Sequence, residues 1–115
     1  MDIRCTLKKN SDFRRLYSKG KSVVTPYLVL YCRRNRLGVN RLGYTVSTKL
    51  GHAVVRNRVR RRLREIYRLN SQALKTGWDI VVVARSRCVG AQYQRMNAAF
   101  LDACSKLDLL KEDKA

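Results

Sequence analysis

The segment from Val55 to Leu74 constrains the fold more than any other, because its apolar residues share a face only in a helix. At about 100° per residue they gather on roughly a third of the circumference. They are Val55, Val59, Leu63, Ile66, Ala73 and Leu74. We therefore predict a long helix over residues 53–75, with Gly77 as its stop. The chain has 115 residues, 45% of them apolar, which is enough for one domain with a core.

The opposite face of this predicted helix is lined with arginine. Between positions 56 and 68 the chain has seven arginines, and Glu65 is the one acidic residue there. The stripe at i, i+3, i+4, i+7 and i+11 consists of Asn57, Arg60, Arg61, Arg64 and Arg68. Like charges at this spacing repel, and solvated faces usually mix signs, so we interpret the stripe as a surface that binds phosphate. Arg62 falls within the apolar stripe, and its role stays open.

The whole chain is strongly basic. It has 26 lysines and arginines against 8 acidic residues, a net charge of +18. Such an excess repels itself, so we expect a polyanion as partner, with nucleic acid favoured over an anionic membrane surface. No apolar stretch approaches the roughly 20 residues of a membrane span, and no secretory signal is seen, so we expect a cytoplasmic protein.

The cysteines are irregularly spaced and form no pair typical of a metal site. They are Cys5, Cys32, Cys88 and Cys104, and the chain has one histidine. This pattern does not match a zinc site, so we expect reduced thiols and no metal bound by the protein.

The remaining patterns predict a small sheet flanked by helices. The predicted elements are a helix at 12–19, strands at 21–24, 27–33, 41–47 and 80–83, and a final helix at 91–107. Ser11 is the expected N-cap of the first helix and Gly20 its stop, with Phe13, Leu16 and Tyr17 on one face.

These elements define the expected fold class. Strands 27–33 and 41–47 are expected to pair antiparallel, and the β-branched run at 80–83 to be covered on both faces. The order αβββαβα indicates an α+β fold, a two-layer α/β sandwich. We expect residues 1–115 to form a single domain, with a basic arm at 1–10 and a frayed tail at 111–115.

The approach to the long helix adds candidate anion-binding groups. Lys49, Gly51 and His52 directly precede it. Small residues let a phosphate backbone come close, and main-chain N–H groups at a helix start favour anions. The candidate nucleic-acid-binding residues from these patterns are Lys49, Gly51, His52, Asn57, Arg60, Arg61, Arg64 and Arg68.

Residues 41–61, RLGYTVSTKLGHAVVRNRVRR, resemble the signature of the bacterial ribonuclease P protein family, centred on Arg56-Asn57-Arg58. Residues 7–13, LKKNSDF, resemble the entry to the family's first helix, and residues 78–85, WDIVVVAR, its last strand. Together these segments span most of the chain, in order and at suitable spacing.

The resemblance implies a fold and a set of roles that spacing alone did not provide. The family fold is ribosomal protein S5 domain 2-like, with a left-handed crossover through the long helix. The family's Arg-Asn-Arg helix contacts a catalytic RNA subunit, one protein to each RNA, which adds Arg56 and Arg58 to the candidate RNA-binding residues. A central cleft holds the single-stranded 5′ leader of precursor tRNA, here through Phe13, Tyr17 and Tyr31. Tyr17 and His52 replace residues often seen in the family, and Phe13 and Tyr17 fit core packing equally well.

The acidic residues and the single histidine argue against catalysis by the protein itself. Before residue 100 the acidic residues are scattered over different elements, at Asp2, Asp12, Glu65 and Asp79, and we expect Asp79 to serve in a turn or a salt bridge and not as a metal ligand. The resemblance places catalysis on the RNA, with Mg²⁺ bound mainly by that RNA.

Three other functions were weighed. A structural RNA binder, such as a ribosomal protein, fits the charge but not the Arg56-Asn57-Arg58 triplet with its flanks. A DNA-binding regulator should have a short recognition helix after a tight turn. A membrane-surface helix should carry aromatic residues beside its cations, but Trp78 lies outside it.

Overall fold

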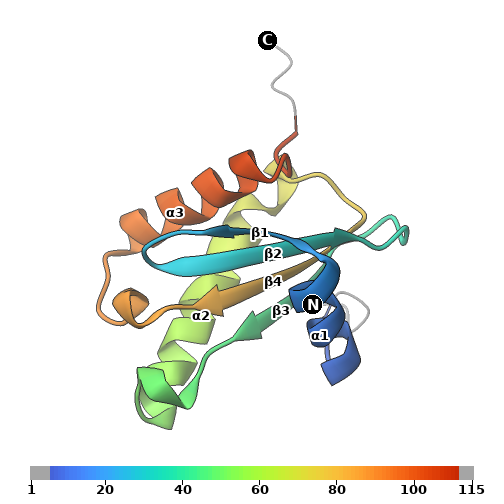
Figure 1. Cartoon of the computed structure of the whole chain (residues 1–115). Coiled ribbons are helices and arrows are strands. Elements are labelled where there is room, and N and C mark those ends of the chain that lie inside the picture. The colour runs from blue at the N-terminus through green and yellow to red at the C-terminus, as the bar shows by residue number, and fades with distance from the viewer. Residues whose placement is uncertain (1–5, 112–115) are drawn as a thin grey trace.

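The computed structural model describes residues 6–111 and has the predicted order of helices and strands (Figure 1). The elements are α1 (Asn10–Lys19), β1 (Lys21–Val24), β2 (Leu28–Arg34), β3 (Arg41–Thr45), α2 (Ala53–Asn70), β4 (Trp78–Ala84) and α3 (Tyr93–Lys106). Short 3-10 turns lie at Thr48–Leu50, Ser71–Ala73 and Ser86–Cys88. The α+β class predicted from the sequence is confirmed.

The sheet has the order β1-β2-β4-β3, which corrects the expected strand pairing. Strand β4 lies between β2 and β3, antiparallel to β2 and parallel to β3. The predicted antiparallel pairing of segments 27–33 and 41–47 is therefore wrong. Ile80, Val81 and Val82 of β4 are at most 1% exposed. A strand that is apolar on both sides is fully buried only in the interior of a sheet. Strand β4 therefore lies between β2 and β3, although β2 and β3 are neighbours in the sequence.

Helices cover both faces of this sheet. Ile80 and Val82 belong to the core beneath α2 and α3, whereas Val81 packs with Leu7 and Leu16 beneath α1. Two-sided burial of β4, predicted from its β-branched run, is confirmed.

The connection from β3 through α2 to β4 has the rare left hand. In Figure 1, β3 and β4 point to the lower left, β4 lies above β3, and α2 passes behind the sheet. A right-handed connection, the usual one, would place α2 on the face that α1 occupies.

Several element ends differ from the expected ones. Helix α1 begins at Asn10 after Lys9, so Ser11 lies inside the helix and is not its N-cap. Gly20 does end α1, but for a steric reason, because a Cβ there would lie 2.6 Å from the Leu16 carbonyl oxygen. Helix α2 ends at Asn70, whose side chain donates to the Ile66 carbonyl oxygen at 2.8 Å. The buried Leu74 follows after a 3-10 turn, not on the helix.

The described parts of both chain ends pack on the domain. Leu7 is buried, and its N–H donates to the Leu42 carbonyl oxygen at 2.9 Å. The N–H of Lys111 donates to the Ala73 carbonyl oxygen at 2.8 Å. Residues 6–10 are therefore not a free arm, and the tail is anchored as far as Lys111. The rest of the predicted arm and tail, residues 1–5 and 112–115, lies outside the described residues.

An ion pair joins the starts of β3 and β4, and it fulfils the role expected of Asp79. Asp79 accepts from Arg41 Nε at 2.7 Å and Nη2 at 2.6 Å, and from Asn35 Nδ2 at 2.9 Å. The hydrogen bond to Asp79 raises the pKa of Arg41. Asp12 of α1 lies farther from the same guanidinium group, at 4.0 Å.

We expect Asp79→Ala to lower the free energy of unfolding by roughly 3 kcal/mol, because it leaves a largely buried guanidinium group without its carboxylate. The Asp79 side chain is 13% exposed and that of Arg41 24%. Urea unfolding measures the change. Asp12→Ala is the control, and its loss should stay below about 1 kcal/mol. Equal losses in the two variants would contradict a stabilising role for the pair.

Candidate nucleic-acid interface

Helix α2 buries its apolar stripe and exposes most of its arginines, as its periodicity predicts. Val59, Leu63 and Ile66 are buried. Arg56 and Arg60 are half-buried at the margins, and the exposed polar residues are Asn57, Arg58, Arg61, Arg64 and Arg68. The helix therefore presents a row of guanidinium groups on a rigid support.

One carboxylate among the described residues pairs with this row. Arg68 donates to Glu65 through Nε at 3.1 Å and Nη2 at 2.5 Å. This hydrogen bonding lowers the pKa of Glu65 and raises that of Arg68. Arg60 donates to Asn57 Oδ1 at 3.3 Å. The unbalanced positive charge thus lies toward the start of α2, and Arg68 is the arginine least available to a ligand.

The segment before α2 leaves main-chain donors free at the helix start. His52 is the N-cap residue but makes no side-chain capping bond, and it is exposed, as is Lys49. Gly51 has a φ of 142°, and a Cβ there would lie 3.2 Å from the Val55 side chain. The glycine is therefore required by the backbone conformation that turns the chain into α2.

Arg62, whose role the sequence left open, is a structural residue. Its Nη1 donates to the Ala91 carbonyl oxygen at 2.9 Å. Ala91 lies two residues before α3, so the bond ties the middle of α2 to the start of α3. This separates Arg62 from the arginines that face outward.

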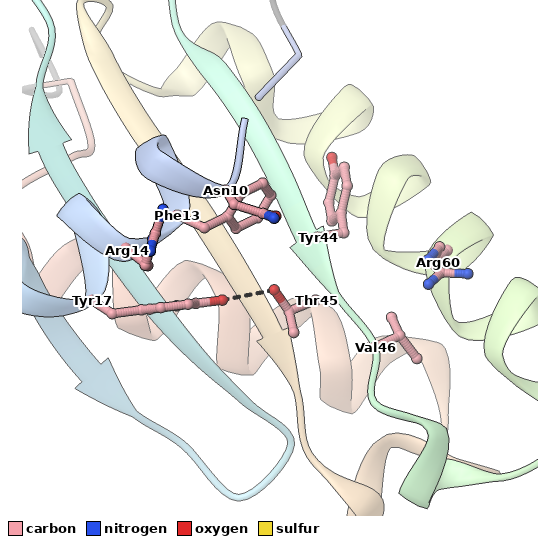
Figure 2. A pocket seen from close by; sticks show the side chains of 8 residues that line it. All are labelled: Asn10, Phe13, Arg14, Tyr17, Tyr44, Thr45, Val46 and Arg60. Atoms are coloured by element: carbon pink, nitrogen blue, oxygen red, sulfur yellow. Dashed lines mark hydrogen bonds between the residues drawn. The ribbon is translucent and has the colours of Figure 1, made fainter. Parts of the chain in front are cut away.

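A depression of about 550 Å³ lies where α1 and α2 approach the edge strand β3 (Figure 2). Its lining comes from α1, from β3 and the residue that follows it, and from α2: Asn10, Phe13, Arg14, Tyr17, Tyr44, Thr45, Val46 and Arg60. The Tyr17 hydroxyl and Thr45 Oγ1 are hydrogen-bonded at 2.8 Å. Figure 2 shows this bond bridging α1 and β3. We call this depression the cleft.

The three aromatic residues predicted to act together are in contact. The Tyr17 and Tyr31 rings meet edge-on, with their centroids 4.9 Å apart, and the centroids of the Tyr17 and Phe13 rings are 6.5 Å apart. Phe13 rests on Gly43, where a Cβ would come within 2.7 Å of the ring. Tyr17 is 41% exposed, whereas Phe13 and Tyr31 are half-buried. Tyr31 packs behind Tyr17 and is not part of the cleft lining.

Tyr44 is a cleft residue that sequence reasoning missed. Its hydroxyl is buried and has no hydrogen-bond partner among residues 6–111. Burial raises the pKa of Tyr44, with Tyr67 adding to the effect and Arg64 opposing it. The hydroxyl therefore stays protonated at neutral pH. Strand alternation places Tyr44 with Leu42 and Val46 on the core side, so the sequence pattern marks it only as core.

The described cysteines are buried and unpaired. Burial raises the pKa of Cys32 to about 11 and that of Cys104 to about 12. Cys88 is also a buried free thiol, and Cys5 lies outside the described residues.

Within residues 6–111, no three His, Cys, Asp or Glu side chains cluster as metal ligands would, and no helix is long and apolar enough to cross a membrane.

A guanidinium-lined helix beside an aromatic cleft is the composition expected of a nucleic-acid-binding protein. The chain matches the family model for ribonuclease P over residues 1–108. It is 45% identical over 104 residues to the ribonuclease P protein component of Alkaliphilus oremlandii, covering 90% of this chain and 91% of the relative. The Thermoanaerobacter sp. component is 49% identical over 90 residues, 78% of each chain.

Solved structures agree with these relatives. The ribonuclease P protein of Staphylococcus aureus superposes with a TM-score of 0.84 at 31% identity, covering 93% of this chain and 98% of that one. The Thermotoga maritima protein gives 0.78 at 32% identity, covering 84% and 92%. The chain belongs to the family of bacterial ribonuclease P protein components.

We expect Arg62→Ala to lower the free energy of unfolding by about 1–2 kcal/mol, because the Ala91 carbonyl loses its donor and the arginine stem no longer packs beside α2. Arg61→Ala, its exposed neighbour, removes the same charge and should change stability by less than about 0.5 kcal/mol. Thermal or urea unfolding of the two variants measures the difference. Equal stability would remove the structural role assigned to Arg62.

Proposed function

We propose that the chain is the protein subunit of a ribonuclease P ribonucleoprotein, binding the catalytic RNA through α2 and the 5′ leader of precursor tRNA through the cleft. One observation carries this proposal. Arg60 belongs to the arginine row of α2 and also lines the cleft with Phe13 and Tyr17. The two surfaces are therefore continuous, and an RNA bound on one lies beside a strand bound on the other.

The α2 surface suits the phosphate backbone of a folded RNA. Each arginine that neutralises a phosphate releases condensed counterions, and the planar guanidinium group binds phosphate oxygens in pairs. Lys49, Gly51 and His52 extend this surface to the free main-chain donors at the helix start.

The cleft suits a single strand of variable sequence. Aromatic rings stack on any base, and Tyr17 exposes part of its ring there while Phe13 and Tyr31 support it. Arg14 and Arg60 supply positive charge for the backbone of the strand. A site of this composition selects single-stranded RNA and discriminates little between base sequences.

The chemistry of cleavage is assigned to the RNA. Among residues 6–111, the cleft lining contains no aspartate, glutamate or histidine, so this part of the chain places no imidazole or carboxylate beside the strand for acid-base catalysis or metal binding. Mg²⁺ ions held mainly by phosphate oxygens of the RNA would supply the activated water that removes the leader. The protein's part is to hold the leader and to reduce the repulsion between two RNA molecules.

Reconstitution tests this function directly. The purified chain is mixed with a bacterial ribonuclease P RNA at low Mg²⁺, and cleavage of precursor tRNA is followed. The chain should stimulate cleavage at the mature 5′ end, with the effect saturating at one protein per RNA. Cleavage by the chain alone, or no stimulation, would overturn the proposal.

We expect the double variant Arg56→Ala and Arg58→Ala to bind the catalytic RNA more weakly and with less dependence on salt. The slope of log affinity against log salt should fall by about one for each phosphate that the variant no longer neutralises. Arg87→Ala with Arg95→Ala is the matched control, because it removes two exposed arginines outside α2. A slope that stays unchanged in the Arg56 and Arg58 variant would exclude these residues as phosphate ligands.

We expect Tyr31→Ala to weaken binding of leader-bearing tRNA by less than the roughly 1–3 kcal/mol of a directly stacked ring, because Tyr17 loses the side chain that supports it, and to leave binding of mature tRNA unchanged. The measurement is the affinity of the reconstituted complex for the two tRNAs. Tyr31→Phe keeps the ring and should behave as wild type. Equal weakening for both tRNAs would remove Tyr31 from the leader site.

A further inference from the structure

A second cationic depression lies on the other side of α1 from the cleft. Its volume is about 760 Å³, and it is lined by Arg15, Arg33, Arg34, Asn35, Arg36, Arg41 and Asp79. These residues come from α1, the end of β2, the turn after it, and the starts of β3 and β4. We call it the arginine depression. It contains none of the candidate binding residues predicted from the sequence.

Most of the charge in the arginine depression is unbalanced. Asp79 is its one acidic residue, and it is already bound to Arg41 and Asn35. Arg34 lies over the Trp78 ring at 5.7 Å. Within residues 6–111, no carboxylate forms an ion pair with Arg15, Arg33, Arg34 or Arg36. Four guanidinium groups held around one hollow attract an anion with several charges.

The turn that carries Arg36 is built to hold one shape. Asn35 Oδ1 accepts the Leu37 N–H at 2.8 Å, and Asn35 Nδ2 donates to the Val39 carbonyl oxygen at 3.0 Å and to Asp79. Arg36 itself has a φ of 62°, in the left-handed region that costs a non-glycine residue energy. A strained arginine fixed at the rim of a cationic hollow is consistent with a binding role.

Helix α1 is the wall between the cleft and the arginine depression, and cationic side chains line both sides of it. Arg14 lines the cleft and the adjacent Arg15 lines the depression. Asp12, the one acidic residue of α1, is 15% exposed at its side chain and lies 4.0 Å from Arg41. A strand leaving the cleft therefore reaches the depression by crossing one helix, about 10 Å wide, without meeting an exposed carboxylate.

We propose that the arginine depression binds backbone phosphates of the distal leader, the nucleotides farther from the cleavage site than those in the cleft. This rests on the proposed function. The start of α2 lies at the opposite end of the sheet from the turn between β2 and β3 (Figure 1), which favours the leader over the RNA bound to α2. The one aromatic ring at the site, Trp78, is half-buried and has Arg34 over it, so contacts are to phosphates and depend on leader length, not sequence.

Leader length provides the test. The reconstituted complex is assayed for binding of mature tRNA and of precursors with leaders of about 5 and about 15 nucleotides, lengths that fill the cleft alone or extend beyond it. Wild type should bind the longer leader more tightly. The double variant Arg33→Ala and Arg36→Asn should lose this gain and keep wild-type affinity for the short leader, since Asn tolerates the left-handed conformation. The salt slope of the affinity gained from the longer leader should also fall by about 1.4, which is about 0.7 for each of two phosphate contacts on a single strand.

Controls separate the possible failures. Arg15→Ala, at an exposed position in α1, should give part of the same loss and guards against a folding defect. Arg87→Ala with Arg95→Ala should keep the gain. Weaker binding of the catalytic RNA by the Arg33 and Arg36 variant, without tRNA, would assign the depression to that RNA and overturn the proposal. If wild type binds both precursors equally well and more tightly than mature tRNA, this inference alone is overturned. If wild type binds both precursors no more tightly than mature tRNA, the proposed function is overturned as well.

Discussion

Burial of β4 on both faces is the constraint on which the rest of the structure depends. Ile80 and Val82 require cover on one side and Val81 on the other, so the helices divide between the two faces. Helices α1 and α2 then reach the edge strand β3 from opposite sides. The cleft is the space left where they meet, and its two arginines, Arg14 and Arg60, come from helices on opposite faces of the sheet.

Carboxylates are scarce in this chain and several of them hold the fold together. Asp79 joins β3 to β4 through Arg41, and Asp108 and Asp102 pair with Lys75 and Lys106 near the C-terminal end. With 8 acidic residues against 26 basic ones, the remaining positive charge gathers on outer surfaces. The apolar side of α2 holds its arginines close together despite their repulsion. A bound polyanion would relieve that repulsion and stabilise the folded state by mass action.

Local patterns predicted most elements, and the failures arise where distant segments meet. Helical spacing identified α2, and the β-branched run marked β4 as buried. The position of β4 between β2 and β3 depends on a long-range crossover that no local pattern encodes. The bond from Arg62 to Ala91 spans 29 positions, and the cleft position of Tyr44 depends on β3 being an edge strand. Arg15 and Arg36 look like ordinary solvated cations until the fold brings them together.

The anchoring of Arg62 to the Ala91 carbonyl has a mechanical consequence. A helix packed by an apolar stripe alone can roll about its axis by small amounts, which would swing long side chains over several ångströms. The hydrogen bond from Arg62, in the middle of α2, to the residues before α3 opposes that rotation. The outward side chains of α2 therefore keep a fixed orientation relative to the sheet. Less orientational freedom is lost when a rigid partner docks. A partner that binds α2 would therefore also fix the orientation of the cleft relative to itself.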